Sequence, residues 1–183
     1  ILPFYAHLLG LAAATLLCDL ALHLGNLVWI GRYLGIPGVI LILASFGHSL
    51  RKRGLIRSRN PTRLLRLHEW LAWLGATLVL VHAGIHFNAV LAWLATFAMA
   101  LNIVSGLTGK YLVLRAQRWL KAARGALDAQ GLSAAEIEQQ LFWDSLVAAG
   151  VRKWRAIHIP ISVTFAVLAG AHIVAVFLFW GWK

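Results

Sequence analysis

Five apolar stretches, each long enough to cross a lipid bilayer, constrain the fold of this chain more than any other feature. The hydrocarbon core of a bilayer is about 30 Å thick, which a helix of about 20 apolar residues spans. Water is absent there, so each stretch must satisfy its own backbone hydrogen bonds as an α-helix. The predicted spans cover residues 2–24, 33–50, 67–87, 90–112 and 157–180. The composition of the chain, with 61% hydrophobic and 13% charged residues, excludes an ordinary soluble domain.

The third and fourth spans are almost continuous in sequence. As one helix, residues 67–112 would measure about 69 Å, more than twice the bilayer core. We therefore expect the chain to turn back near Phe87, Asn88 and Ala89. The predicted fold class is an all-α integral membrane protein, with residues 1–183 forming a single transmembrane domain of five helices.

The basic residues predict the orientation of these helices. Of the 17 Lys and Arg residues, seven lie in residues 51–66 and eight in residues 110–155. With five spans, both connections fall on one side of the membrane, which the positive-inside rule makes cytoplasmic. The N-terminus is then cytoplasmic, the C-terminus lies on the outer side, and the third and fifth spans run parallel. Because topology accounts for the net charge of +11, no nucleic-acid partner is expected.

The polar segment 113–155 is predicted to form two short amphipathic helices at the cytoplasmic surface. Gly125 and Gly131 are expected to bracket a break between them. Ser133 and Glu136 have the spacing of a capping box, which predicts a helix that starts after Ser133. The segment either packs on the membrane surface or provides a docking face for a soluble partner.

Two histidine pairs with identical spacing lie on the two parallel spans: His68 with His82, and His158 with His172. Fourteen residues make nearly four helical turns, so each pair lies within about 40° of one face and about 21 Å apart. Parallel packing would bring His68 to His158 and His82 to His172. Ionisable side chains inside a membrane indicate function. Facing imidazoles are a common way to hold haem iron, and with both axial positions filled the iron transfers single electrons. The alternative is four unrelated histidines that hydrogen-bond helix carbonyls.

Other residues near the histidines are further candidates. Gly75 and Phe165 are the midpoints of the two pairs. The missing side chain of Gly75 could leave room for a porphyrin edge or for a large residue opposite, such as Phe165, or the position could be an ordinary helix contact. Arg66 and Arg155 flank the inner pair and are candidates for binding haem propionates or lipid headgroups. His86, one turn beyond His82, is the alternative outer ligand, although its depth matches His172 less well.

Asp19 and His23 lie one turn apart on the first span. Such a pair could handle the protons of a quinone, and it could equally be an interfacial hydrogen bond. A quinol oxidoreductase with its own site near Asp19, His23 and His86 is therefore the alternative function. A membrane di-iron enzyme using His82 and His86 is disfavoured, because the chain holds only one such histidine box, on the outer side.

The chain resembles the ferric-reductase-like transmembrane domain and the small bacterial di-haem b-type cytochromes over about residues 33–182. The resemblance is carried by the two histidine pairs, by Ser-Gly-x-x-Gly-Lys-Tyr-Leu from Ser105, and by Trp-Arg-Ala-Ile-His-Ile-Pro from Trp154. It implies two haems b, the inner one ligated by His68 and His158 and the outer one by His82 and His172. It also implies a multi-pass protein of the bacterial inner membrane, with its C-terminus in the periplasm.

That family usually continues into a flavin and nicotinamide domain, and this sequence has no phosphate-binding glycine fingerprint. The chain is therefore expected to be an electron-transfer subunit of an oxidoreductase complex rather than a catalyst alone. Electrons would pass between a partner, such as an iron–sulfur or flavin protein, or quinone, and an outer acceptor such as a cytochrome c.

Overall fold

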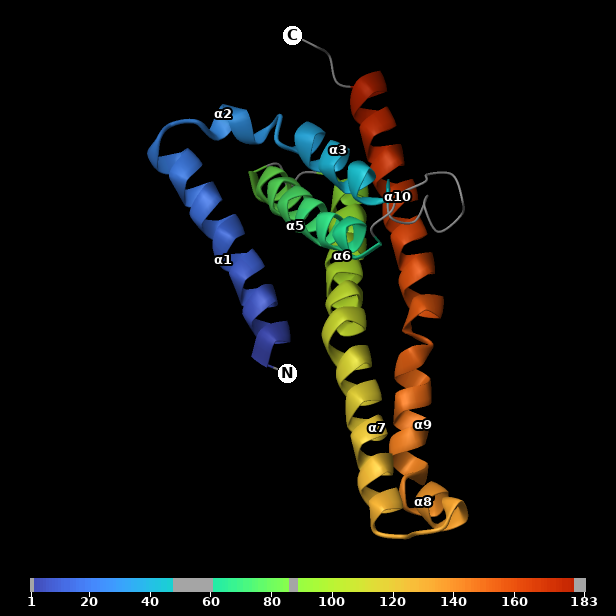
Figure 1. The fold of residues 1–183 in the computed structure, drawn as a ribbon. Helices are drawn as coiled ribbons and strands as arrows, with labels where there is room; N and C mark the ends of the chain where they lie inside the picture. The colour runs from blue at the N-terminus through green and yellow to red at the C-terminus, as the bar shows by residue number, and fades with distance from the viewer. Residues whose placement is uncertain (1, 48–60, 86–88, 180–183) are drawn as a thin grey trace. The chain divides into compact units, whose positions relative to one another are not determined.

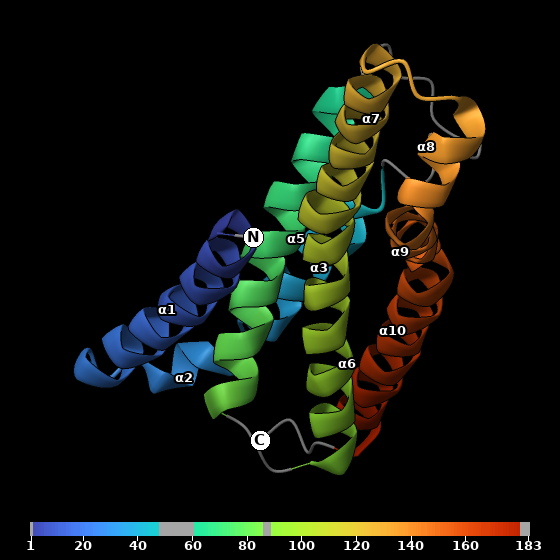
Figure 2. The same cartoon turned by 90° about the horizontal axis from the view of Figure 1, so that it is seen from below.

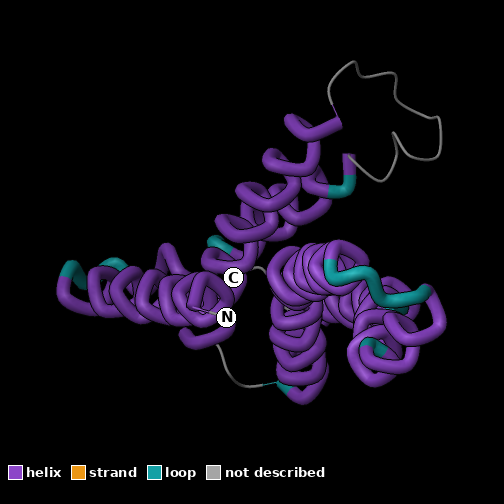
Figure 3. Tube along the Cα trace, turned by 60° about the horizontal axis from the view of Figure 1, so that its bottom comes forward, coloured by secondary structure: helices purple, strands orange, loops and turns teal. Residues whose placement is uncertain are grey.

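The computed structural model describes residues 2–47, 61–85 and 89–179, and in these ranges every regular element is a helix (Figure 3). Five helical stretches there are long and apolar enough to cross a membrane, which confirms the predicted number of spans. Their bounds are Leu2–Leu24, Val28–Ser45, Thr62–Ile85, Val90–Ala129 and Ala156–Phe179.

The chain divides into two compact units, and Figure 1 labels their helices. The N-terminal unit comprises His7–Thr96. It contains most of α1 (Leu2–Leu24), then α2 (Val28–Gly31), α3 (Gly35–Ser45), α5 (Pro61–Ile85) and the first part of α6 (Val90–Leu107). Within this unit α3 packs along α5, and α2 also contacts α5. α5 ends at Ile85 and α6 begins at Val90, which confirms that the third and fourth spans are two helices. Residues 86–88 lie outside the described ranges.

The C-terminal unit comprises Phe97–Lys183 together with Ile1–Ala6. Its chain follows the end of α6, a π-helical turn η1 (Thr108–Val113), α7 (Leu114–Ala129), α8 (Ala134–Gln140), α9 (Phe142–Arg152) and α10 (Trp154–Phe179). α7 and α9 contact each other and α8 joins them into a hairpin (Figures 1 and 2). Pro160 lies inside α10, where its ring removes one backbone donor from the helix.

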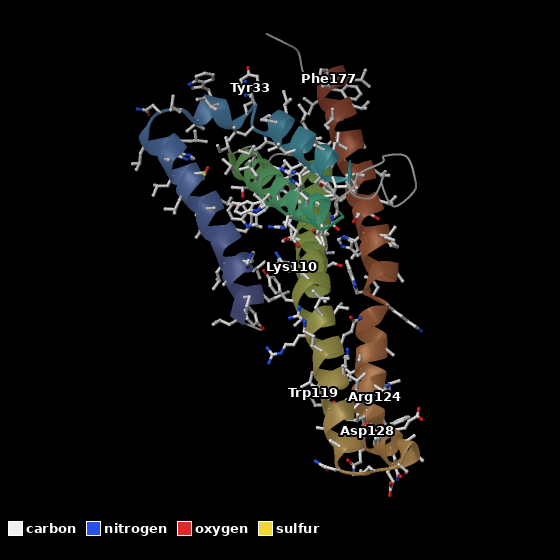
Figure 4. The ribbon with its side chains drawn as sticks, viewed as in Figure 1. Tyr33, Lys110, Trp119, Arg124, Asp128 and Phe177 are labelled. Carbon is white, nitrogen blue, oxygen red and sulfur yellow. The ribbon has the colours of Figure 1, made fainter. Side chains whose placement is uncertain are left out.

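The helix of the predicted fourth span continues well beyond Leu112. Helix continues through η1 to Ala129, so the stretch from Val90 is 40 residues long. At 1.5 Å per residue this is about 60 Å, twice the thickness of a bilayer core, so one end must project beyond the hydrocarbon. Hydropathy falls near Leu112, but α7 is rich in Ala, Leu and Arg, which favour helix. Trp119, Arg124 and Asp128 follow one another along α7 (Figure 4).

The polar segment therefore forms three helices, α7, α8 and α9, instead of two. The prediction that Gly125 borders a break was wrong, since it lies inside α7; one glycine costs a helix only about 1 kcal/mol. The break falls at Gly131, whose φ of +80° is accessible to glycine. The predicted capping box is confirmed: the backbone N–H of Ser133 donates to the Glu136 carboxylate (2.8 Å), and Ser133 Oγ accepts from the Glu136 N–H (3.4 Å).

The apolar surface of the helices is largely uncovered by the chain itself. α1 buries only Leu11 among its described residues, and Leu24 and Phe179 are 78% and 84% exposed. Water would oppose so much exposed apolar surface, whereas lipid would not. The arrangement is that of a multi-pass membrane protein.

Candidate functional site

The four candidate histidines are divided equally between the two units. His68 and His82 lie on α5 in the N-terminal unit, and His158 and His172 lie on α10 in the C-terminal unit. Each side chain is half-buried. Each helix is unbroken between its two histidines, so the fourteen-residue spacing does correspond to about 21 Å along a helix in both cases.

Both α5 histidines donate a hydrogen bond to the backbone that packs against α5. His68 Nδ1 lies 2.9 Å from the carbonyl oxygen of Ser45, and His82 Nδ1 lies 3.1 Å from the carbonyl oxygen of Gly31. A carbonyl oxygen can only accept, so Nδ1 must carry the proton. In a neutral imidazole of this tautomer the lone pair is on Nε2, the nitrogen that can then ligate a metal.

His158 has a different kind of partner. Its Nδ1 lies 3.2 Å from Ser105 Oγ on α6, a hydroxyl that can accept or donate. The Trp154 ring lies against the imidazole, with centroids 4.9 Å apart. Trp154 in turn fills the space beside Gly109, where a Cβ would come within 2.5 Å of the indole. The two sequence stretches that start at Ser105 and at Trp154 therefore pack together around His158.

The midpoint residues are both buried, and Gly75 has a clear packing role. A Cβ at Gly75 would lie 2.7 Å from the carbonyl oxygen of Gly38 and 2.8 Å from Ile42 Cγ1. The room left by the missing side chain is thus taken by α3, which is the helix contact that the sequence left open, and a part for Gly75 in haem binding stays a prediction. Phe165 is 6% exposed, inside the C-terminal unit.

The remaining candidates are less well defined. Arg66 is exposed near the start of α5. The side chain of Arg155 and the whole of His86 lie outside the described residues. Asp19 and His23 do come together on α1: His23 Nδ1 lies 3.6 Å from Asp19 Oδ1 and 2.9 Å from the Asp19 carbonyl oxygen. The contact to the carbonyl is an ordinary one-turn helix contact, and the His23 side chain is 54% exposed.

Sequence reasoning missed the groups that hold the histidines. Gly31, Gly35 and Gly38 on α2–α3 lie at one-turn intervals, and this small-residue spacing is a visible signal of close helix packing. The acceptors themselves are backbone carbonyls of Gly31 and Ser45, which no residue type reveals.

Within residues 2–47, 61–85 and 89–179, no three His, Cys, Asp or Glu side chains gather as a metal-binding group. Axial ligation of a haem needs only two imidazoles and would not form such a group. Comparison with protein-family models, with curated proteins and with solved structures yields no significant match to this chain.

Proposed function

We propose that this protein is a di-haem b-type cytochrome that carries electrons across the membrane, as a subunit of an oxidoreductase complex. His68 and His158 would ligate the inner haem, and His82 and His172 the outer one. Electrons would pass between a partner protein or quinone on the cytoplasmic side and an acceptor such as a cytochrome c on the outer side. The orientation and the bacterial inner membrane belong to the same proposal.

The observation that carries the proposal is the hydrogen bonding of the two α5 histidines. The Nδ1 atoms of His68 and His82 both donate to carbonyl oxygens, at 2.9 and 3.1 Å, on a helix that spaces the two rings by almost four turns. Metal-ligating histidines characteristically donate the other ring N–H to a carbonyl or carboxylate, which fixes the ring and raises its basicity. His23 also bonds a carbonyl oxygen, so the acceptor type by itself equally fits histidines without a shared ligand. What favours haem ligation is its combination with the fourteen-residue spacing, which α10 repeats.

The chain's own residues do three things in this scheme. α5 and α10 each supply two imidazoles about 21 Å apart, a separation that spans much of the bilayer core. Backbone carbonyls and the Ser105 hydroxyl hold the rings. Apolar helix surfaces exclude water around them. A haem with two imidazole ligands supplies one-electron redox chemistry and has no open position for substrate.

The test is a set of histidine-to-alanine variants of the purified full chain, measured by pyridine haemochrome and redox titration. We expect about two haems b per chain in the wild type. His68→Ala and His158→Ala should lose the same haem, and His82→Ala and His172→Ala should lose the other, because each haem needs both axial ligands. His23→Ala, on α1, is the control and should keep both.

Three results would contradict the proposal: a wild-type protein without haem, a His23→Ala variant that loses one, or loss of different haems in the two members of a pair. His86→Ala decides the alternative outer ligand. Loss of the outer haem in that variant and its retention in His82→Ala would transfer the role to His86.

A further inference from the structure

The contacts between α2–α3 and α5 follow a constant antiparallel register. Gly31 lies opposite His82, Gly38 opposite Gly75, and Ser45 opposite His68. From Gly31 to Ser45 the chain advances fourteen residues, the same interval that separates the two histidines on α5. The two acceptor carbonyls therefore lie at the end of α2 and at the end of α3, separated along the chain by the same interval as the histidines that they serve.

Glycines allow this segment to lie close to α5. A Cβ at Gly38 would lie 2.7 Å from Val79 Cγ2 and 3.0 Å from the Gly75 carbonyl oxygen. The reciprocal Cβ at Gly75 would lie 2.7 Å from the Gly38 carbonyl oxygen. Distances this short against backbone leave no room for a methyl group on either helix. The Gly38–Gly75 contact sits midway between the two histidines, so it sets the helix separation for both of them.

Gly35 is placed differently, because it touches one histidine directly. A Cβ there would lie 3.0 Å from His82 Cδ2 and 3.1 Å from both Cγ and Nε2. The His82 ring is thus held by its Nδ1–H bond to Gly31 and by the backbone of Gly35. Gly84 lies two residues beyond His82 on α5, and a Cβ added there would meet no described atom within 4 Å, so it provides a matched control.

We infer that α2–α3 is a positioning element for both α5 imidazoles, with Gly35 positioning His82 alone and Gly38 positioning the two together. This inference rests on the proposed function. A carbonyl that accepts the Nδ1 proton makes Nε2 a stronger electron-pair donor to the haem iron. This stabilises the ferric state and lowers the reduction potential of that haem. Weakening the hydrogen bond of His68 or of His82 should therefore raise the reduction potential of the haem that this histidine ligates.

The experiment compares Gly35→Ala, Gly38→Ala and Gly84→Ala with the wild type, in the haem-loaded full chain. The readouts are the two midpoint potentials and the low-spin ferric EPR signals, which respond to imidazole orientation. The haems are assigned through the histidine variants. Gly35→Ala should raise the outer-haem potential and shift its EPR signal, with the inner haem unchanged. Gly38→Ala should alter both, and Gly84→Ala neither.

Gly31→Ala is a second variant in case Gly35→Ala does not assemble. Its added methyl meets the flexible end of the Ile85 side chain, so the helix can accept it while Ile85, three residues beyond His82 on α5, must move next to the hydrogen bond from His82 to the Gly31 carbonyl. Again the outer haem alone should respond. The inference is overturned if Gly35→Ala and Gly31→Ala leave both signals unchanged, or if they disturb the two haems equally. A wild type without haem would instead overturn the proposed function.

Discussion

At the residue scale, the histidines differ in what holds them. His68 and His82 donate to carbonyls, whose position depends on a whole helix, whereas His158 pairs with the single hydroxyl of Ser105. A backbone acceptor cannot be removed by substitution. The Ser105 hydroxyl can be removed, so the proposed inner haem site is the one where a single hydrogen bond can be tested by itself.

Ser105→Ala should weaken the inner site without affecting the outer one. Loss of a ligand's outer hydrogen-bond partner typically costs about 10- to 100-fold in metal affinity. We expect a comparable loss of inner-haem retention, with a shifted inner-haem potential in the fraction that remains loaded. Haem titration of the apo-protein and redox titration of the loaded protein measure the two effects.

Two further variants on α6 control this measurement. Ser105→Thr retains a hydroxyl and should restore most of the affinity. Thr96→Ala removes a hydroxyl that donates to the Ala92 carbonyl of its own helix, so inner-haem binding should stay as in the wild type. Equal haem retention in Ser105→Ala and the wild type would show that the Ser105 contact has no role in ligation.

At the scale of elements, the sequence predicted helices well and helix ends less well. The apolar runs predict which residues must be helical because they cross the membrane. They do not predict where a helix ends once the chain has left the membrane. Residues 114–129 are polar, and they continue α6 because their intrinsic preference is helical and no proline interrupts them. Where a specific terminating signal exists, as at Ser133 and Glu136, the prediction was correct because the signal is local.

The capping box gives α8 a pH dependence. The pKa of Glu136 is lowered below its ordinary value of 4.5, mainly by the hydrogen bond from the Ser133 side chain and also by that from the Ser133 backbone. A lowered folded-state pKa stabilises the helix above the ordinary value, and the stabilisation is lost as the pH falls through the folded-state pKa. Hydrogen-exchange protection of α8 should therefore decrease when the pH is lowered below about 4.5.

Ser133→Ala should reduce that protection at neutral pH and remove most of its pH dependence. Glu138→Gln, on the same helix but outside the capping box, is the control and should retain it. If Ser133→Ala titrates like the wild type, a different group governs the acid sensitivity of α8.

At the scale of the whole molecule, the decisive property is orientation in the membrane. In the orientation that we propose from the positive-inside rule, the α7–α9 hairpin would lie in the cytoplasm and the connection after α1 outside. The assignment of inner and outer haems depends on this orientation.

Cysteine labelling tests the orientation in a Cys18→Ser background. With a membrane-impermeant thiol reagent applied from outside, Leu27→Cys should react, and Gln130→Cys should react only after permeabilisation. The two positions lie in the turn after α1 and at the end of α7, respectively. The opposite pattern would invert the protein and exchange the two haem assignments, although the histidine pairing would stand.

The sequence by itself determined the five spans, the histidine spacing and the capping box, because each depends on residue type along a short or periodic stretch. Only the tertiary structure decided what holds the histidines. The carbonyls of Gly31 and Ser45 reach His82 and His68 because Gly38 and Gly75 let two helices approach closely, and Gly75 thereby proved to be a packing residue. Every residue has a carbonyl, so which of them meets an imidazole depends on the register between helices and on their separation.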